Sequence, residues 1–358
     1  MPFKNDISAI RYIRHVIYTY VVCHKTNPNL MTKNDNKWKD FLLKSGVPLE
    51  FEIKKILKDL GFDSYSEHSY LRKDENNIVN EFSYDINSTL KIDNQLFELM
   101  VECKYRDEST NWIFIPEEYN ESDRGAGTMS FLNTNDFFYK KEFPDFYKLI
   151  NFDILAPLCS KGIEINSSGQ NPKTITQALH QLCYGIIDKV TEGMKQQLDE
   201  NEDTEHLIFH HIPIIITTAN LYRLKNSVTI SEIKNADNFE SIATREYMLL
   251  LEPKISLELE KYSYQKLDFF INEYGIEKLN SKLHKKNKIH NWTFKDHQKM
   301  ISRDYPEGIL VIQHEQDNKG LSALIKILNE IARPSKKYQV LNDLIKDWKK
   351  TGKNIDNE

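Results

Sequence analysis

A helical repeat followed by three strand-like runs, all within residues 48–105, constrains the fold of this chain most. Hydrophobic residues recur at steps of three and four over 48–60, which predicts an amphipathic helix. The three runs that follow it predict strands over 65–71, 78–86 and 95–105. A longer helix is expected over 174–195 and an apolar, β-branched strand over 207–218. This order of elements predicts an α/β fold with a mixed central β-sheet flanked by helices.

Two further regions flank the predicted core. The chain has 358 residues, 40% of them hydrophobic and 28% charged, which is typical of a globular protein with one large or two modest domains. We expect an N-terminal helical extension over 1–45, a core with insertions over 46–258 and a C-terminal helical and strand region over 259–358. The last region is expected to hold two extra helices with a strand between them: 264–283, 308–313 and 321–332.

The N-terminal stretch and the cysteines indicate a cytoplasmic location. The apolar segment 7–23 contains Arg11 and Arg14 and is too short to span a membrane, and polar residues precede it. The four cysteines form no C-x-x-C pair, which argues against a zinc ribbon. The net charge of -5 argues against a protein that covers nucleic acid with its whole surface, although a local basic cleft remains compatible with it.

Two charged residues interrupt the third predicted strand. Glu102 and Lys104 are two positions apart, so their side chains point to one face of the strand. Val101 and Cys103 point to the opposite face, into a core. Burying two such charges without partners would cost several kcal/mol, on the order of the penalty for a lone buried charge. The pair is therefore either exposed to solvent on an ordinary α/β sheet or part of a functional site.

Asp85 favours the functional site. It lies at the end of the second predicted strand, which a short turn joins to the third, so it can lie beside Glu102. Two neighbouring carboxylates repel each other, and a divalent cation relieves that repulsion. Oxygen ligands without paired Cys or His favour Mg²⁺ or Mn²⁺, which can polarise a phosphodiester and lower the pKa of a bound water. Lys104 could then orient that water or stabilise the charge that develops on the phosphate.

The order of these residues resembles the PD-(D/E)xK nuclease superfamily, which includes many restriction endonucleases and the archaeal Holliday junction resolvases. The resemblance covers about residues 46–106 and rests on three motifs: Gly46-Val-Pro-Leu-Glu50, Glu81-Phe-Ser-Tyr-Asp85 and Val101-Glu102-Cys103-Lys104. Tyr84 stands where the family has a proline, a departure that is common in this superfamily. A lone Glu-x-Lys triplet occurs by chance in most chains, so the ordered set of motifs carries the resemblance.

The resemblance implies a role for each matched residue. Glu50 takes the place of the acid on the first helix, with Glu52 as the weaker candidate. Asp85 and Glu102 take the place of the strand carboxylates, and Lys104 that of the catalytic lysine. The metal ligands implied are therefore Asp85, Glu102 and Glu50, and the fold implied is restriction endonuclease-like.

A polar face on the helix predicted over 174–195 adds to this resemblance. Some nucleases of the superfamily carry a Gln and a Tyr on the helix after the core strands. Gln181, or Gln177 one turn earlier, would then contact a substrate phosphate or a metal-bound water. The alternative is a polar helix face that has no part in catalysis.

A basic segment over 282–303 is the candidate nucleic-acid surface. Lysines neutralise phosphates and aromatic rings stack on bases, and this segment contains both. The residues expected to bind nucleic acid are Lys285, Lys286, Lys288, Trp292 and Lys295. The alternative is a solvated linker between helices. His210 and His211 are adjacent on a predicted strand and face opposite ways, so they cannot bind one metal together.

The prediction is a Mg²⁺- or Mn²⁺-dependent nuclease that cuts DNA, with a role in restriction or defence that rests on family analogy alone. Two alternatives remain open: a catalytically inactive nucleic-acid-binding module of the same fold, and a nuclease that cuts RNA. A homodimer that cuts both strands and other subunits of a defence system are the protein partners to consider.

Overall fold

The computed structural model describes the chain in seven segments: 37–73, 79–117, 131–142, 156–171, 173–199, 206–285 and 291–333. The chain divides into two units, Met1–Leu43 and Lys44–Glu358. The helix predicted over 7–23 lies outside the described residues. Helix α2 (Lys37–Lys44) closes the first unit, and the elements that follow α2 belong to the second.

Four strands of the large sheet match the predicted core. The first three, β1 (Asp63–Lys73), β2 (Val79–Ile92) and β3 (Gln95–Lys104), form an antiparallel meander. Strand β8 (Ile208–Thr217) then pairs parallel to β3 over its whole length. Because β3 and β8 run parallel, the chain must cross over between them, and α4 (Lys173–Asp199) lies within that connection. The predicted mixed sheet is confirmed. The predicted order of helix, three strands, helix and strand is interrupted by further strands between positions 111 and 171, and β2 continues to Ile92, past its predicted end at position 86.

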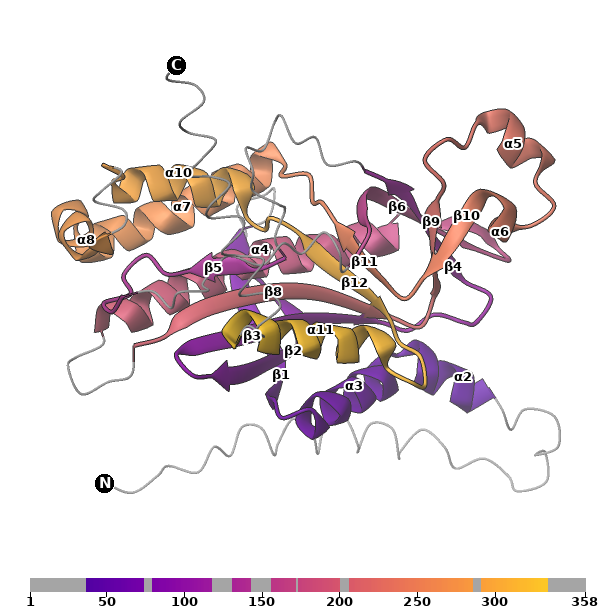
Figure 1. Ribbon diagram of the computed structural model, residues 1–358, viewed down its shortest axis with the longest axis horizontal. Coiled ribbons are helices and arrows are strands. Elements are labelled where there is room, and N and C mark those ends of the chain that lie inside the picture. The colour runs from indigo at the N-terminus through magenta and orange to yellow at the C-terminus, as the bar shows by residue number, and fades with distance from the viewer. Residues whose placement is uncertain are drawn as a thin grey trace, which may run out of the picture. The chain divides into compact units, whose positions relative to one another are not determined.

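Helices cover both faces of this sheet (Figure 1). Helix α3 (Val47–Asp59) and α11 (Lys319–Ala332) bury hydrophobic residues in the same cluster as alternate residues of β8, including Ile214 and Ile216. Ile215 between them belongs to the opposite cluster, together with α4. The same opposite face carries α7 (Leu257–Tyr274), α8 (Ile276–Lys282) and α10 (Phe294–Asp304). The alternation of a β-strand thus divides the core into two layers.

The C-terminal region differs from its prediction in two ways. The single helix expected over 264–283 is wrong: α7 begins at Leu257 and stops before Gly275, whose φ of 83° leaves the right-handed helical region. Strand β12 (Ile309–Gln313) pairs with β8 on one side and with β11 (Met248–Leu251) on the other. The C-terminal region therefore supplies a strand to the middle of the sheet, within the same compact unit as the core.

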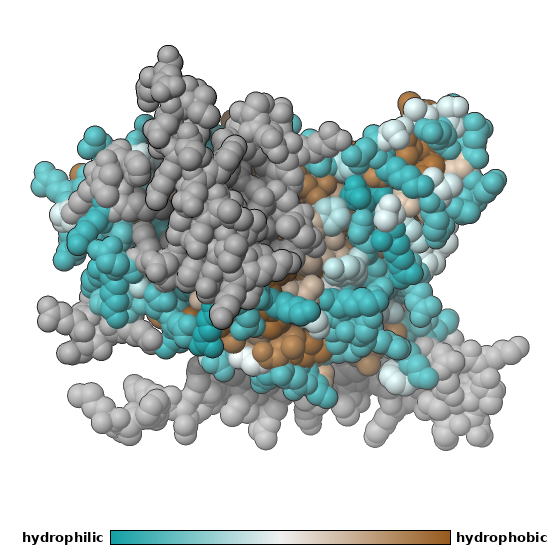
Figure 2. All heavy atoms as spheres, viewed as in Figure 1, coloured by the Kyte–Doolittle hydropathy of each residue, from teal (hydrophilic) through white to brown (hydrophobic). Residues whose placement is uncertain are grey.

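Residues between β3 and α11 also extend the sheet beyond β11. The strands beyond β11 are β6 (Leu158–Asn166), β4 (Asn111–Pro116), β9 (Asn220–Leu224) and β10 (Ala243–Glu246), and β7 (Gly169–Asn171) pairs with β6. Strand β5 (Asn133–Asn135) instead pairs with β8. Between β9 and β10 lie two short helices, α5 (Ile230–Asn235) and α6 (Phe239–Ile242). Figure 2 shows hydrophobic groups among polar ones at this end of the molecule, where Ile230 and Ile233 are exposed. None of the helices in the described part of the chain combines enough length and hydrophobicity to cross a membrane.

Candidate functional site

The candidate site lies where β2 and β3 stop pairing. Their ladder runs from Ile92 opposite Gln95 to Ile86 opposite Val101, and ends there. The next pair in this register would be Asp85 and Glu102. Instead, the backbone N–H of Cys103 donates a hydrogen bond to Asp85 Oδ2 at 2.6 Å. The carboxylate of Asp85 thus replaces a backbone acceptor at the end of the ladder and is held next to Glu102.

The backbone around Asp85 departs from regular alternation. Ile86 packs in the layer of α3, whereas Tyr84, two residues earlier, packs in the layer of α4. In a regular strand both would face the same way, so the direction of the side chains changes at Asp85. Across the β1–β2 ladder, Glu67 interrupts the regular pairing with a φ of 31°. Non-glycine residues with positive φ are uncommon and cluster at functional sites.

Helix α3 brings Glu50 to the same place. The helix begins after Gly46, whose φ of 83° lies in the left-handed region, and Pro48 occupies its first turn. The N–H of Glu50 donates to the Gly46 carbonyl at 3.1 Å, and a Cβ at position 46 would lie 3.3 Å from Glu50 Oε1. The carboxylate therefore turns back towards the helix N-terminus, where the helix dipole favours a negative charge.

Glu102 is the most constrained acid of the site. Its side chain is 1% exposed, and its Oε1 accepts a hydrogen bond from the Lys104 ammonium. Its Oε2 is buried and has no hydrogen-bond partner among the described residues. Burial above all, and then the charge of Asp85, raise the pKa of Glu102 to about 8, although Lys104 acts in the opposite direction. The charge of this carboxylate is therefore under-compensated by the residues around it.

The other two predicted ligands are affected in the same direction. Burial is the main cause of the raised pKa of Asp85, against which the hydrogen bond from Cys103 and the charge of Lys104 act. Burial also raises the pKa of Glu50, and Asp85 raises it further, while Lys104 lowers it. The structure thus brings Glu50, Asp85, Glu102 and Lys104 together, and the one lysine faces all three acids.

A fourth acid, Glu67, was missed by the sequence analysis. It is exposed on β1, its Oε1 accepts a hydrogen bond from Ser83 Oγ at 2.7 Å, and its charge raises the pKa of both Asp85 and Glu50. No motif marks it, because its place in the site depends on the positive φ at position 67 and on the β1–β2 register. Neither can be read from the polar residues around it.

The residues of the site fit a divalent cation in their chemistry. Glu102 Oε2 is a buried, unpaired carboxylate oxygen, and burial together with neighbouring acids raises the pKa values of Glu50, Asp85 and Glu102 although Lys104 acts against it. Hard oxygen donors of this kind suit Mg²⁺ or Mn²⁺. Within the described ranges, however, no three His, Cys, Asp or Glu side chains are gathered closely enough to surround an ion on their own.

Gln181 is close to the site but already engaged. Its side-chain amide donates to the carbonyl of Ser83 at 3.0 Å, two residues before Asp85, and its backbone carbonyl accepts from Tyr70 Oη at 2.9 Å. Gln181 therefore fastens α4 to β1 and β2, and the contacts present give it a positioning role. The phosphate or water contact expected of it remains a prediction, and Gln177 is exposed on the same helix.

The predicted basic surface is only partly described, and two of its lysines face acids. Lys285 lies 3.5 Å from Glu142, and Lys295 lies 3.2 Å from Asp268. Trp292 is 45% exposed. Lys286 and Lys288 lie outside the described residues. Pairing with acids reduces the local positive charge below what the count of lysines suggested, so the nucleic-acid role of this segment remains a prediction.

The two adjacent histidines of β8 face opposite layers, as predicted. His210 contacts Thr134 Oγ1 at 3.0 Å and Gln95 Oε1 at 2.9 Å. His211 contacts Glu98 Oε2 at 2.8 Å on the side of α4. Both rings are buried, and their partners differ, so they form no common metal site.

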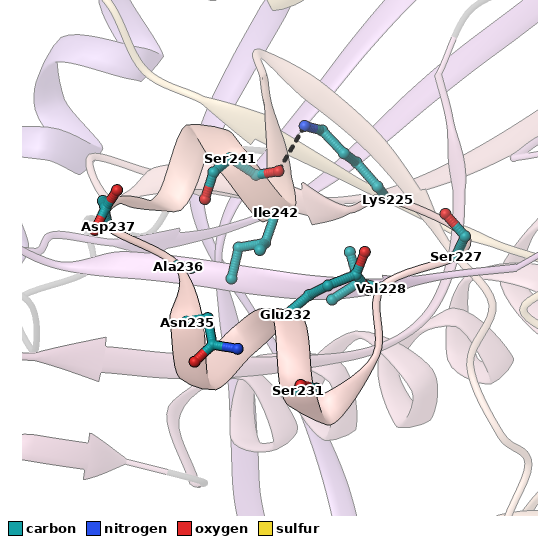
Figure 3. Close-up of a pocket in the computed structure, with 10 residues that line it drawn as sticks. All are labelled: Lys225, Ser227, Val228, Ser231, Glu232, Asn235, Ala236, Asp237, Ser241 and Ile242. Atoms are coloured by element: carbon teal, nitrogen blue, oxygen red, sulfur yellow. Dashed lines mark hydrogen bonds between the residues drawn. The ribbon is translucent and has the colours of Figure 1, made fainter.

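A pocket of about 340 Å³ lies away from these residues, in the segment between β9 and β10 (Figure 3). The Lys225 ammonium at its rim donates to the Ser241 carbonyl at 2.7 Å. The lining residues are Lys225, Ser227, Val228, Ser231, Glu232, Asn235, Ala236, Asp237, Ser241 and Ile242. None of the residues predicted for catalysis lines it.

Comparisons of this chain with family models, with curated proteins and with solved structures found no match.

Proposed function

We propose that this protein is a metal-dependent nuclease that hydrolyses phosphodiester bonds at the junction of α3, β2 and β3. The observation that carries the proposal is the buried Glu102, which has one oxygen on Lys104 and the other unpaired, next to Asp85. Burying an under-compensated acid lowers stability, so such groups concentrate at functional sites.

Asp85, Glu102 and Glu50 are the residues that would hold Mg²⁺ or Mn²⁺. When bound, the cation supplies Lewis acidity towards a phosphodiester oxygen and lowers the pKa of water. The hydrogen bond from the Cys103 backbone holds the Asp85 carboxylate, and the Glu50 carboxylate lies against the turn at Gly46. Support of a ligand by the backbone favours a fixed ligand position.

Lys104 is assigned to the charge that develops on the phosphate. Its side chain is 22% exposed, so the ammonium can reach a substrate oxygen while Glu102 holds it in place. An ammonium can donate to a non-bridging phosphate oxygen or hold the attacking water, and either contact strengthens as negative charge builds up. Glu50, which is half-buried and has a raised pKa, suits the acceptance of a proton from that water.

DNA is the proposed substrate, and RNA is the alternative that the same phosphodiester chemistry allows. A role in restriction or defence, with a homodimer or other subunits as partners, rests on the resemblance to the PD-(D/E)xK superfamily. A catalytically inactive binding module is the second candidate function. The presence of all four residues, Glu50, Asp85, Glu102 and Lys104, favours the enzyme over that module.

A cleavage assay separates these functions. Supercoiled plasmid, linear duplex DNA and single-stranded RNA are incubated with the protein in Mg²⁺, Mn²⁺ or EDTA. We expect cleavage that requires metal, that Glu102→Gln abolishes, and that the exposed control Glu277→Gln leaves unchanged. Binding of nucleic acid without metal-dependent cleavage of any substrate would favour the inactive module instead.

A further inference from the structure

Arg72, near the end of β1, carries a positive charge for which the described residues provide no anionic partner. Its guanidinium carbon lies 4.1 Å from the ring centre of Tyr184 and 4.5 Å from that of Phe82. Its Nε is buried without a hydrogen-bond partner among the described residues. Arginines in acidic proteins usually pair with carboxylates, and this chain has 53 Asp and Glu residues. The guanidinium of Arg72 is therefore available to bind an anionic ligand.

The two aromatic rings leave Arg72 able to bind an anion. Stacking uses the face of the guanidinium, whereas its N–H donors lie in its plane and are not used by the stacking contacts. Tyr184 is 3% exposed and is fixed in turn by an edge contact with Tyr262, with ring centres 5.0 Å apart. A planar donor group whose orientation is set by packing matches the bidentate geometry of phosphate oxygens.

The acids near Arg72 contact other residues. Asp188 on α4 contacts Lys266 at 2.7 Å through Oδ1, whereas its Oδ2 is buried and has no hydrogen-bond partner among the described residues. Glu258 lies close to Tyr184, whose pKa is raised to about 12 by burial first and by Glu258 second. Neither acid forms an ion pair with Arg72 within the described part of the chain. An incoming anion thus meets the guanidinium without first displacing a carboxylate.

Arg72 lies on the same strand pair as the proposed catalytic site. In the β1–β2 register Arg72 is opposite Asn80, and Glu67 falls in line with Asp85. Five residues of strand separate positions 67 and 72, or about 17 Å. Tyr70, between them, is influenced by the charges of both Glu102 and Arg72. At about 3.4 Å per nucleotide in B-form DNA, this distance corresponds to about five nucleotides.

We propose that Arg72 binds a backbone phosphate of the nucleic-acid substrate, several nucleotides from the bond that is cut. This inference rests on the proposed nuclease function, because it assigns a second contact to the same substrate. The ligand chemistry is a phosphodiester, which DNA and RNA share.

Salt-dependent binding tests the inference without requiring cleavage. Fluorescence anisotropy with labelled duplex DNA and with single-stranded RNA is measured in EDTA over a range of salt concentrations. Arg72→Gln should weaken binding and reduce the slope of log affinity against log salt by about 0.9 for duplex DNA or about 0.7 for a single strand. Arg72→Lys keeps the charge but loses the planar fork, so it should retain the slope and bind more weakly. The preferred nucleic acid is the one that shows the larger effect.

Arg333→Gln is the matched control. It removes one positive charge that already pairs with Asp93, at 2.8 Å, at the far end of β2. Its slope should equal that of the wild type, and circular dichroism should show that all three variants are folded. Unchanged salt slope and affinity in Arg72→Gln would overturn the inference. The nuclease proposal would still stand in that case if the wild type cleaves nucleic acid in the presence of metal. A salt slope that depends on Arg72, without cleavage of any substrate, would support the phosphate contact and count against the nuclease proposal. Absence of nucleic-acid binding by the wild type would overturn the inference.

Discussion

Glu98 and Glu102 occupy one face of β3, four residues apart, and both are buried, yet their surroundings differ in opposite ways. Glu98 contacts Lys189 at 2.9 Å and His211 at 2.8 Å, and it accepts a hydrogen bond from Asn87 at 3.1 Å. Burial alone would raise its pKa, but His211 and Lys189 outweigh that effect and lower the pKa to about 2. Glu98 is therefore a fully compensated acid.

Glu102 is buried to a similar degree as Glu98, but the groups around it do not balance its negative charge. One lysine contacts it, another acid lies beside it, and one of its oxygens has no partner among the described residues. Burial and Asp85 therefore leave its pKa at about 8. The difference teaches that burial by itself does not mark a functional acid; the charge balance around the buried group does.

The largest expected effect concerns the compensated acid. Glu98→Gln leaves Lys189 and His211 without their shared carboxylate, and removing one partner of a buried ion pair typically costs about 3–5 kcal/mol. We expect the free energy of unfolding, measured in urea with EDTA at neutral pH, to fall by that amount. Glu102→Gln, the matched variant, should lose little stability, because a Glu102 with a pKa of about 8 is already mostly uncharged at neutral pH. Equal losses in the two variants would contradict the distinction between the acids.

The next effect concerns the lysine that serves Glu102. Lys104→Ala should reduce the rate of cleavage by about 100-fold or more, the usual loss when one group that stabilises the transition state is removed. Metal affinity should change little, because Lys104 is not assigned as a ligand. Lys161→Ala, an exposed lysine on β6, is the control for general loss of charge. Near-normal cleavage by a folded Lys104→Ala protein would remove Lys104 from the mechanism.

Metal binding by Asp85 and Glu102 gives a smaller expected effect. A cation that binds only the folded protein stabilises it by about 2.7 kcal/mol at a concentration of 100 times its Kd. Mn²⁺ should therefore raise the melting temperature of the wild type, and calorimetry should show binding. Asp85→Ala and Glu102→Gln should abolish both effects, whereas Glu277→Gln should retain them. Binding of the same strength by Asp85→Ala would count against the proposed ligand set.

The smallest effect, when it is taken per pH unit, is a dependence of stability on pH without metal. The folded-state pKa of Glu102 is about 8, above its ordinary value of 4.5, so the folded protein holds a proton that the unfolded chain releases. The stability contributed by protonated Glu102 is complete below pH 4.5 and is lost as the pH rises towards about 8, with a slope of at most about 1.4 kcal/mol per pH unit.

Glu98 has the opposite sign. Its folded-state pKa of about 2 lies below 4.5, so its contribution to stability is present above pH 4.5 and is lost as the pH falls towards about 2. The free energy of unfolding in EDTA should therefore change less with pH between 5 and 8 in Glu102→Gln than in the wild type. The loss of stability in acid should persist in this variant. An unchanged profile in Glu102→Gln would mean that another group titrates in this range.

Local patterns predicted the central part of the fold well. The periodicity of residues 48–60 and the three strand-like runs correspond to α3, β1, β2 and β3, and the apolar run over 207–218 corresponds to β8. These predictions succeed because the periodicity of a helix or a strand appears in the pattern of hydrophobic residues along a short stretch of sequence. The strand predicted over 308–313 corresponds to β12. Its place between β8 and β11, like the places of the other strands beyond the core, depends on pairing between distant segments and was not predicted.

The candidate site follows the same division. Glu50, Asp85, Glu102 and Lys104 could be chosen from the sequence, because strand alternation places Glu102 beside Lys104. Asp85 was expected at the end of its strand, but β2 continues to Ile92, and the β2–β3 register is what brings Asp85 next to Glu102. Only the tertiary structure decided that Glu102 keeps an unpaired oxygen, that Glu67 joins the site through a positive φ, and that Arg72 stacks on aromatic rings from β2 and α4. The physical reason is that charge compensation depends on which side chains meet in space, and those meetings are set by strand register and helix packing rather than by the order of residues along the chain.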